Sequence, residues 1–347
     1  MYDTIRPLLF ALDAETAHRW TLYGLGVAQR SGLMRMVAHA PPKDFPVRAF
    51  GIEFPNPVGL AAGLDKNGEH LDALGALGFG FIEIGTITPK PQPGNPRPRM
   101  FRLPQHEAII NRLGFNNDGV DALLRNVQGA SWRGVLGINI GKNAVTPNER
   151  AIDDYLHCLE RVYPLASYVT VNISSPNTKG LRDLQGADEL PRLLGVLRER
   201  HEQLASQHRS NKPLLLKIAP DLDDAQMDAI AKAVLDAGLD GLICTNTTID
   251  HSAIADEPLA SETGGLSGKP LFEKSTTILR GMAQRIAGKI PLVGVGGILS
   301  GSDATEKLDA GATLVQIYSG MVYRGPWLIT ECVEEIRRQR ATSEASA

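Results

Sequence analysis

The sequence predicts an α/β protein: a (β/α)₈ TIM barrel preceded by a small N-terminal helical lobe. Short, apolar, β-branched segments recur from about residue 55 onward, with stretches of helical apolar spacing between them. Near-continuous apolar strands that alternate with amphipathic helices indicate a parallel sheet covered by helices. Eight such units favour a closed barrel, and an open doubly wound sheet is the alternative. The expected strands are residues 57–63, 81–86, 135–141, 168–174, 214–220, 241–247, 291–297 and 313–320.

The segment before the barrel predicts short helices. One is expected around Ile5–Leu12, a second after Asp13 as its N-cap, and a third near Leu33–Ala38. Apolar residues are dense here, and five Lys/Arg against three Asp/Glu give a charge of +2. Such a lobe fits a membrane surface or an apolar ligand, and a helical cap packed on the barrel floor is the alternative. The expected parts of the chain are residues 1–43 (lobe), 44–340 (barrel) and 341–347 (C-terminal tail).

Composition argues against several classes of protein. A net charge of −3 over 347 residues gives no electrostatic footprint for nucleic acid. Three widely spaced cysteines argue against a disulfide framework or a zinc site, and HExxH, calcium-loop and P-loop motifs are absent, so we expect no metal. No apolar run approaches the roughly 18 residues that span a bilayer. The N-terminal residues do not have the pattern expected of a cleaved signal peptide. These features are typical of a cytoplasmic protein.

Polar residues stand at nearly every predicted strand exit. In (β/α)₈ barrels the active site lies at the carboxyl ends of the strands. One such residue would mean little, because an asparagine alone is more often a turn residue, but the whole set indicates a lined site. The set comprises Asp65, Lys66, Thr86, Asn139, Asn172, Lys217, Asn246, Thr247, Gly296, Gly297 and Ser319.

The turns after the last two strands, VGVGGI and QIYSG, stand where barrel enzymes commonly bind a phosphate. Glycine matters there because a missing Cβ lets the backbone approach the anion closely. GGLSGKP (264–270) is expected to be a further close-approach turn in which Gly268 contacts the same ligand. An ordinary flexible loop is the alternative for that segment.

Lys217 lies inside an otherwise apolar strand, LLLKIAP. Burial of a lysine costs free energy unless the amine meets an anion. We therefore expect a fixed positive charge that faces a group becoming negative during reaction, and a structural ion pair is the alternative. A second cation with several amides offers a site for a small planar ligand that carries a carboxylate and ring amides. These residues are Lys66, Asn111, Asn172, Asn177 and Asn246.

The segment NISSPNTKGLR (172–182) places two serines directly after a strand. Either Ser174 or Ser175 fits a serine turn before Pro176. At the mouth of a barrel, a serine can instead take or give a proton. A hydroxyl is a poor base, so this role needs a relay such as Thr178 or a bound water. No histidine stands nearby, and we expect no Ser-His-Asp arrangement.

Long motifs in this chain resemble the dihydroorotate dehydrogenase family, specifically its quinone-linked, membrane-associated class. The resemblance runs from the N-terminal lobe to about residue 336, and several of the motifs are rarely found elsewhere. They are GLAAGLDKNGE, FIEIGTITPKPQPGNPRPRMFRL, NRLGFNNDG, GINIGKN, VNISSPNTKGLR, KIAPD, TNTT, GGLSGKPL, GVGGI and LVQIYSG.

The resemblance implies a flavin mononucleotide (FMN) at the top of the barrel. Lys217 would then face the N1–C2=O region of the flavin, where negative charge accumulates on reduction. The phosphate would lie on the turns that contain Gly268, Gly297, Tyr318 and Ser319. The other implied cofactor contacts are Ala62, Gly63, Leu64, Asp65, Lys66, Thr86, Asn139, Asn172 and Thr245.

The family reaction oxidises dihydroorotate to orotate in the de novo pyrimidine (UMP) pathway. A base removes a proton from C5 and the C6 hydride goes to flavin N5. The quinone-linked class uses serine as the base where soluble classes carry cysteine, and that position here is Ser175. The implied substrate contacts are Lys66, Asn111, Arg112, Leu113, Gly114, Phe115, Asn172, Asn177, Asn246 and Thr247.

The lobe is absent from the soluble classes, so its presence selects the same class as Ser175. By this resemblance it forms the entrance for ubiquinone or menaquinone and rests peripherally on the cytoplasmic side of the cell membrane. We expect a monomer without a nucleic-acid partner. Two other functions remain open from the residues alone. One is a flavin-free barrel isomerase or lyase acting on a phosphorylated metabolite, and the other is a non-catalytic binder of apolar ligands.

Overall fold

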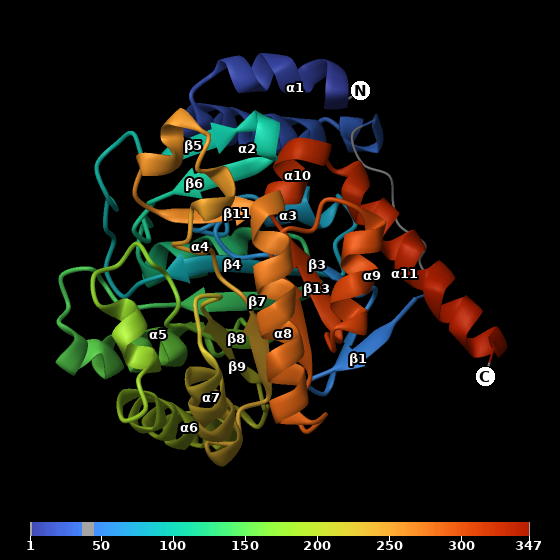
Figure 1. Ribbon diagram of the computed structural model, residues 1–347. Helices are drawn as coiled ribbons and strands as arrows, with labels where there is room; N and C mark the ends of the chain where they lie inside the picture. Colours follow the sequence, from blue (N-terminus) through green and yellow to red (C-terminus); the bar gives the residue numbers. More distant parts are fainter. Residues whose placement is uncertain (1, 37–44, 347) are drawn as a thin grey trace.

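The computed structural model describes residues 2–36 and 45–346, and eight of its strands close into a barrel (Figure 1). All neighbouring strands of the barrel are parallel, in the order β10-β12-β13-β3-β4-β7-β8-β9. The predicted (β/α)₈ barrel is confirmed, and the open sheet is excluded. The strands are β3 (Val58–Leu60), β4 (Phe81–Ile87), β7 (Val135–Ile140), β8 (Tyr168–Asn172), β9 (Leu214–Ile218), β10 (Gly241–Cys244), β12 (Leu292–Val295) and β13 (Leu314–Ile317).

Strand register brings the polar strand exits together at one end of the barrel. Asn172 at the end of β8 pairs with Lys217 in β9, and Asn139 in β7 pairs with Gly85 in β4. The β4–β7 register shifts between Gly85 and Ile87, so the chain bulges next to Thr86. The side chains of neighbouring strands therefore meet at the carboxyl end, as the strand-exit pattern predicts.

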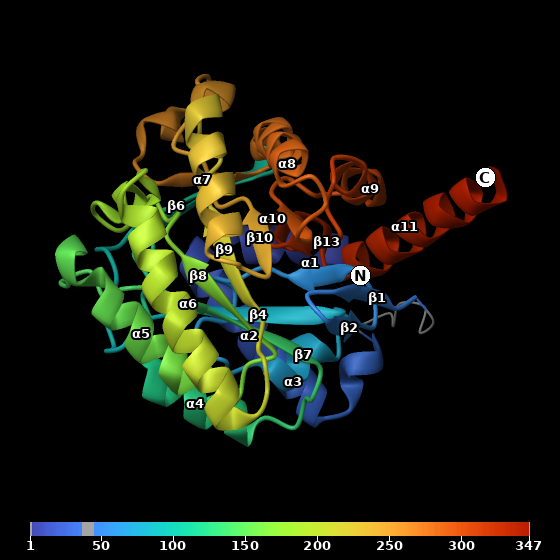
Figure 2. The same cartoon turned by 90° about the horizontal axis from the view of Figure 1, so that it is seen from below.

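Amphipathic helices cover the outside of the barrel (Figure 2). In α5, for example, Tyr155, Cys158, Leu159 and Val162 are fully buried while the acidic first turn faces outward. The last helix extends away from the rest of the molecule in both views, and the residues expected as a C-terminal tail continue it. The helices are α3 (Leu71–Gly75), α4 (Val120–Gly129), α5 (Ala151–Val162), α6 (Glu189–His208), α7 (Asp224–Asp236), α8 (Phe272–Ile286), α9 (Gly301–Asp309), α10 (Ser319–Arg324) and α11 (Trp327–Ser346).

Two small sheets close the ends of the barrel, and periodicity did not predict either. The hairpin of β1 (Val47–Ala49) and β2 (Ile52–Phe54) seals the amino end, where Phe54 packs against Phe81 with ring centroids 5.1 Å apart. At the other end lies an antiparallel sheet in the order β11-β6-β5. Its strands are β5 (Met100–Leu103), β6 (Ala108–Asn111) and β11 (Gly265–Gly268).

Segment 264–270 was predicted as a turn or flexible loop, and this was wrong in part. Residues 265–268 form β11, which pairs with β6 along its whole length. The pairing partner lies more than 150 residues away in sequence, and Gly265, Ser267 and Gly268 give no strand-like apolar pattern. Gly268 still has the positive φ, 92°, that a close-approach position requires.

The N-terminal lobe consists of α1 (Tyr2–Ala11), α2 (Ala14–Arg30) and the 3₁₀ helix η1 (Leu33–Met36). Asp13 is the N-cap of α2, as predicted, and accepts a hydrogen bond from Thr16 N at 2.9 Å. The third helix was predicted to extend to Ala38, and the boundary between lobe and barrel was predicted between residues 43 and 44. Both positions lie within residues 37–44, which are outside the described residues. Among the helices described, none has the length and apolar character needed to cross a membrane.

The lobe lies beside the small sheet at the carboxyl end of the barrel (Figure 1). Arg102 in β5 donates to Leu9 O at 3.0 Å, and Arg99 pairs with Glu15 at 2.7 Å. The alternative of a cap on the barrel floor is therefore wrong, because the β1–β2 hairpin occupies the floor. The lobe instead borders the end of the barrel where the polar residues gather.

Candidate active site

A cavity at the carboxyl end of the barrel brings most of the predicted site residues together. It encloses about 1060 Å³ of empty space, a figure that includes open solvent. Loops after most of the barrel strands contribute to its wall. The predicted residues that line it are Ala62, Gly63, Lys66, Thr86, Asn111, Leu113, Gly114, Phe115, Asn172, Ser175, Asn177, Lys217, Thr245, Asn246, Thr247, Gly268, Gly297, Tyr318 and Ser319.

Four predicted contacts do not line this cavity. Asp65 accepts the backbone N–H groups of Glu69 and His70 at 3.0 and 2.8 Å, so it holds the turn after β3. Arg112 turns away and donates to Glu262 at 2.6 Å. Leu64 and Asn139 complete the four: Leu64 faces a second cavity beside the lobe, and Asn139 lies beneath the floor as a partner of Thr86 and Asn172.

Several lining residues were not predicted. Met100, Ile109 and Ser267 come from the small sheet, and Gln316 points inward from β13. Short antiparallel strands leave a weak periodic signal, so their inward faces could not be assigned from sequence. Gln316 does interrupt an apolar strand, TLVQIYSG, in the same way as Lys217, and that interruption was the available signal.

Hydrogen bonds fix the orientation of the polar groups at the floor of the cavity. The fully buried Glu83 accepts from Asn139 Nδ2 at 2.8 Å, which turns Asn139 Oδ1 toward the cavity. That oxygen accepts from Thr86 Oγ1 at 2.6 Å and from Asn172 Nδ2 at 3.1 Å. Asn172 Oδ1 in turn accepts from the backbone N–H of Ser174 at 3.2 Å. The buried Glu83 carboxylate therefore fixes the orientation of the side-chain amides of Asn139 and Asn172, and Asn172 in turn holds the loop that begins at Ser174.

Two lysines present charge to the cavity without ion-pair partners among the described residues. Burial lowers the pKa of Lys217, and Glu83 opposes the shift. The Lys217 amine makes no hydrogen bond to a described residue, so it fits an anionic group in the cavity. Burial also lowers the pKa of Lys66 to about 8, with a further contribution from Arg99. The alternative prediction for Lys217 was a structural ion pair, and Lys217 forms none with the described residues.

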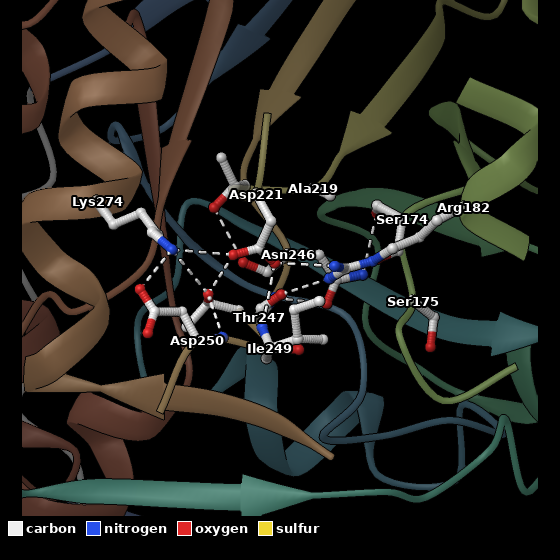
Figure 3. A network of polar contacts seen from close by, with 12 residues as sticks. Ser174, Ser175, Arg182, Ala219, Asp221, Asn246, Thr247, Ile249, Asp250 and Lys274 are labelled. Atoms are coloured by element: carbon white, nitrogen blue, oxygen red, sulfur yellow. Dashed lines mark hydrogen bonds and ion pairs between the residues drawn. The ribbon is translucent and has the colours of Figure 1, made fainter. Parts of the chain in front are cut away.

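The two serines after β8 have different surroundings (Figure 3). Ser174 is fully buried, and its hydroxyl donates to Asn172 Oδ1 at 3.1 Å and accepts from Asn246 Nδ2 at 3.0 Å. Ser175 points away from these contacts and lines the cavity. Among the described residues, its Oγ accepts only a long hydrogen bond, 3.3 Å, from the backbone N–H of Asn177. Ser175 is therefore the serine that can meet a ligand.

Gly268, Gly297 and Ser319 line one part of the cavity wall, where both glycines allow the backbone to pack closely. Gly297 has φ 76°, and a Cβ there would lie 2.5 Å from Phe272 Cα. A Cβ on Gly268 would lie 2.2 Å from Glu107 O. Ser319 and Ser267 share a hydrogen bond of 2.8 Å between their hydroxyl groups. This cradle of backbone and hydroxyl groups fits one phosphate.

A second, larger cavity separates the lobe from the barrel. It encloses about 2450 Å³ and is lined largely by apolar side chains of α1, α2 and α10. Met100, Ile109 and Tyr318 line both cavities, so they form the partition between them. Burial lowers the pKa of His18 to about 4, helped by Lys66 and His70, so this histidine is neutral near pH 7.

The fold and cavity define a (β/α)₈-barrel enzyme with one ligand site at the carboxyl ends of its strands and an apolar cavity beside it. The chain belongs to the dihydroorotate dehydrogenase family, whose model matches residues 45–339. Members of this family are in general flavin-dependent. The resemblance read from the motifs is confirmed.

Named relatives and solved structures agree with this family. The chain is 60% identical to the dihydroorotate dehydrogenase (quinone) of Stenotrophomonas maltophilia, covering 100% of this chain and 99% of the relative. It is 62% identical to that of Chromobacterium violaceum, covering 96% of each. A crystal structure of the Eimeria tenella enzyme in complex with ferulenol superposes with a TM-score of 0.88 at 38% identity, over 95% of this chain and 92% of that one.

Proposed function

We propose that this chain oxidises dihydroorotate to orotate in pyrimidine biosynthesis, with FMN as its flavin and a quinone as the final acceptor. Relatives that match along their whole length carry the name dihydroorotate dehydrogenase (quinone). The observation that carries the proposal is that one cavity joins three groups: a serine hydroxyl with only a long hydrogen bond among the described residues, a buried lysine without an ion-pair partner among them, and glycine turns suited to a phosphate.

The residues of the cavity fit FMN. The cradle at Gly268, Gly297 and Ser319 suits a single phosphate, and Lys217 supplies the positive charge for the ring. When bound, FMN would supply the two-electron acceptor that takes hydride from C6 of the substrate. Thr86 and Asn172, held by Glu83 through Asn139, would orient the ring with fixed hydrogen-bonding groups.

Ser175 is proposed as the base that removes the C5 proton. A serine hydroxyl is a poor base, so the proton must be passed on as it arrives. Thr178, three residues further along the same loop, has a buried hydroxyl that makes no hydrogen bond to the described residues. The Thr178 hydroxyl is therefore available as the first member of a relay from Ser175.

The remaining polar groups suit the substrate. Lys66 would pair with the carboxylate of dihydroorotate, since its amine has no ion-pair partner among the described residues. Asn177 Nδ2 donates to Asn111 Oδ1 at 3.2 Å and Asn111 Nδ2 donates to Gly265 O at 3.3 Å, so both amides are held at the cavity wall beside the proposed substrate. Asn246 is held by Ser174 and stands at the opposite wall. Together these groups would hold the ring flat between Ser175 and the flavin.

The second cavity is proposed as the quinone path, for ubiquinone or menaquinone. Its partition of Met100, Ile109 and Tyr318 would keep quinone and substrate in separate cavities. In the lobe, Leu8 and Trp20 are 72% and 61% exposed, and Trp20 also lines the second cavity. We propose that they contact the membrane on its cytoplasmic side. Loss of co-sedimentation with phospholipid vesicles in a Leu8→Ser, Trp20→Ser variant tests this contact, and light scattering tests the proposed monomer.

A steady-state assay tests the function. Purified protein should show flavin absorbance and form orotate from dihydroorotate with a quinone as acceptor, and it should be much slower with fumarate or NAD. A colourless protein that cannot be reconstituted with FMN would instead support a flavin-free isomerase or lyase. A coloured protein active with fumarate or NAD alone would exclude the quinone-linked reaction.

A further inference from the structure

We propose that Arg182 is a positioning residue that holds the loop of Ser175 against the two neighbouring strand ends. The proposal rests on the role proposed above for Ser175. Sequence patterns did not single out Arg182, because an arginine after KGL gives no signal of its partners. Its contacts come from three consecutive strand ends, after β8, β9 and β10 (Figure 3).

The guanidinium group of Arg182 uses three of its N–H donors on three different segments. Nε donates to Ser174 O at 3.0 Å, Nη1 to Asp221 Oδ2 at 2.8 Å, and Nη2 to Thr247 O at 2.8 Å. Ser174 precedes the proposed base, and Thr247 lines the substrate cavity. A planar fork with fixed N–H directions can satisfy all three acceptors at once, whereas a lysine cannot.

The contact with Ser174 closes a loop of the chain. Arg182 lies eight residues after Ser174, in the 3₁₀ helix η4 (Leu181–Gln185), and its side chain returns to the start of the loop. The turn back is made at Gly180, with φ 67°, whose carbonyl accepts from Asn148 Nδ2 at 2.6 Å. The hydrogen bond from Arg182 to Ser174 therefore closes a loop of the chain that contains Ser175 and the proposed relay residue Thr178.

Asp221 anchors the guanidinium to the barrel. Its carboxylate also accepts from the hydroxyl of Thr248, from Ile249 N at 3.1 Å and from Lys274 Nζ at 3.1 Å. Burial would raise the pKa of Asp221, but these hydrogen bonds and that of Arg182 outweigh it and lower the pKa. Asp221 therefore stays ionised, and Lys274 continues the network to Asp250 at 2.9 Å. The anchor is rigid because it joins β9, β10 and α8.

Every polar group of Ser174 consequently makes a hydrogen bond. Its N–H and hydroxyl contact Asn172, its hydroxyl also contacts Asn246, and its carbonyl contacts Arg182. Among the described residues, the side chain of Ser175 has only the long contact with Asn177 N, so its position depends on Ser174. Removal of the guanidinium leaves the Ser174–Ser175 peptide carbonyl without its hydrogen bond, so this peptide can shift. A displacement of about 1 Å at a reacting group can lower a rate roughly 100-fold.

The test compares Arg182→Gln with Arg285→Gln in the flavin-loaded protein. Arg285 is the control, because its side chain is also 20% exposed and pairs with Asp224 and Asp228, and none of these three residues lines the first cavity. Anaerobic mixing with dihydroorotate should show flavin reduction slowed about 100-fold in Arg182→Gln and unchanged in Arg285→Gln. Flavin content should be similar in the two variants. The melting temperature should fall further in Arg182→Gln, because Asp221 is 15% exposed while Asp224 and Asp228 are 87% and 68% exposed.

Two readouts separate positioning of the base from general damage. With substrate deuterated at C5, the isotope effect on flavin reduction should increase in Arg182→Gln, because proton removal becomes the slow step. In Arg182→Ala, millimolar guanidinium ion should restore part of the rate, while Arg182→Lys should remain slow. An unchanged isotope effect together with no guanidinium rescue would show a merely structural role and overturn the proposal.

If the Arg182 variants fail to fold, Asp221→Asn removes the anchor and keeps the arginine. It should also slow reduction and raise the C5 isotope effect, and wild-type behaviour would overturn the proposal. The Ser175→Ala variant distinguishes the proposed role of Ser175 as the base from the proposed positioning role of Arg182. Fast reduction in Ser175→Ala would mean that the proposed base is wrong. Slow reduction there with normal Arg182→Gln would leave the base intact and exclude the positioning role alone.

Discussion

Ser174 and Ser175 are adjacent, yet the fold gives their hydroxyl groups different partners. Ser174 donates to Asn172 and accepts from Asn246, whereas Ser175 faces the cavity. Turn preferences could not separate the two serines in the sequence, because both precede Pro176 closely enough to make a serine turn. The choice between them depends on the contact with Asn246, which follows β10 and lies 72 residues away, so local sequence does not encode it.

The protonation of the Lys66 amine should make ligand binding depend on pH. Burial lowers its pKa to about 8, so in the free site the amine is charged below about pH 8 and becomes neutral above it. If Lys66 pairs with the substrate carboxylate, the dissociation constant of orotate should be flat below that pH and rise roughly tenfold per pH unit above it.

Orotate titrations of the flavin spectrum between pH 6 and about 10 measure this. Lys66→Met should bind orotate weakly at every pH and flatten the profile. A wild-type profile that stays level through pH 8, or a variant that keeps the rise, would rule out Lys66 as the carboxylate partner.

Lys217 should stabilise bound flavin. Its buried amine lacks a described partner, so a ligand anion would supply a charge-assisted hydrogen bond worth about 1.5–3 kcal/mol. Lys217→Met should therefore weaken flavin binding about 10- to 100-fold. Flavin released on dialysis reports the change, with the exposed Lys232→Met as control. Equal flavin retention in the two variants would contradict this role.

At the scale of elements, the barrel strands could be predicted and the small sheets could not. The barrel strands are buried and largely apolar, so a nearly continuous apolar run marks each of them. The segment 241–247 was predicted too long because Thr245, Asn246 and Thr247 leave the ladder at Cys244 and turn into the cavity. β11 was missed because Gly265 and Gly268 carry no side chain that reports a strand.

The phosphate cradle gives a prediction for one turn. Gly297→Ala places a Cβ 2.5 Å from Phe272 Cα, in backbone with φ 76°. Gly288→Ala is a matched control, because it has φ 74° but open space around its Cβ. The left-handed conformation costs both variants about 1–2 kcal/mol, and only Gly297→Ala must also push the helix start at Phe272 away.

Both variants should therefore lose some thermal stability, but only Gly297→Ala should lose flavin affinity. The melting temperature without flavin and the flavin dissociation constant separate the two effects. If both variants bind flavin as tightly as the wild type, the turn at Gly297 does not hold the phosphate.

At the scale of the whole molecule, the lobe and the barrel share a partition between two cavities. The sequence predicted an amphipathic lobe but not its place, because an apolar helix face shows that a helix packs, not what it packs against. The contacts that place it, such as Arg99 with Glu15, join residues 84 positions apart. The lobe consequently lies at the same end of the barrel as Ser175.

Removal of the lobe should separate the two half-reactions. A protein lacking residues 1–40 should still reduce its flavin with dihydroorotate, since the residues lining the first cavity all lie in the barrel. It should lose turnover with quinone, since α1 and α2 form much of the second cavity. Stopped-flow reduction and quinone turnover on the same folded sample provide the measurement. Undiminished quinone turnover would exclude the lobe as the quinone path.

The most direct test of the account is anaerobic flavin reduction by dihydroorotate in wild-type protein and in Ser175→Ala, at matched flavin content. The wild-type flavin absorbance should bleach on mixing with dihydroorotate. Ser175→Ala should bleach slower by a factor of about 10²–10⁴, the usual contribution of a positioned base. A wild-type protein that does not bleach, or a variant that bleaches at the wild-type rate, would contradict the central claim.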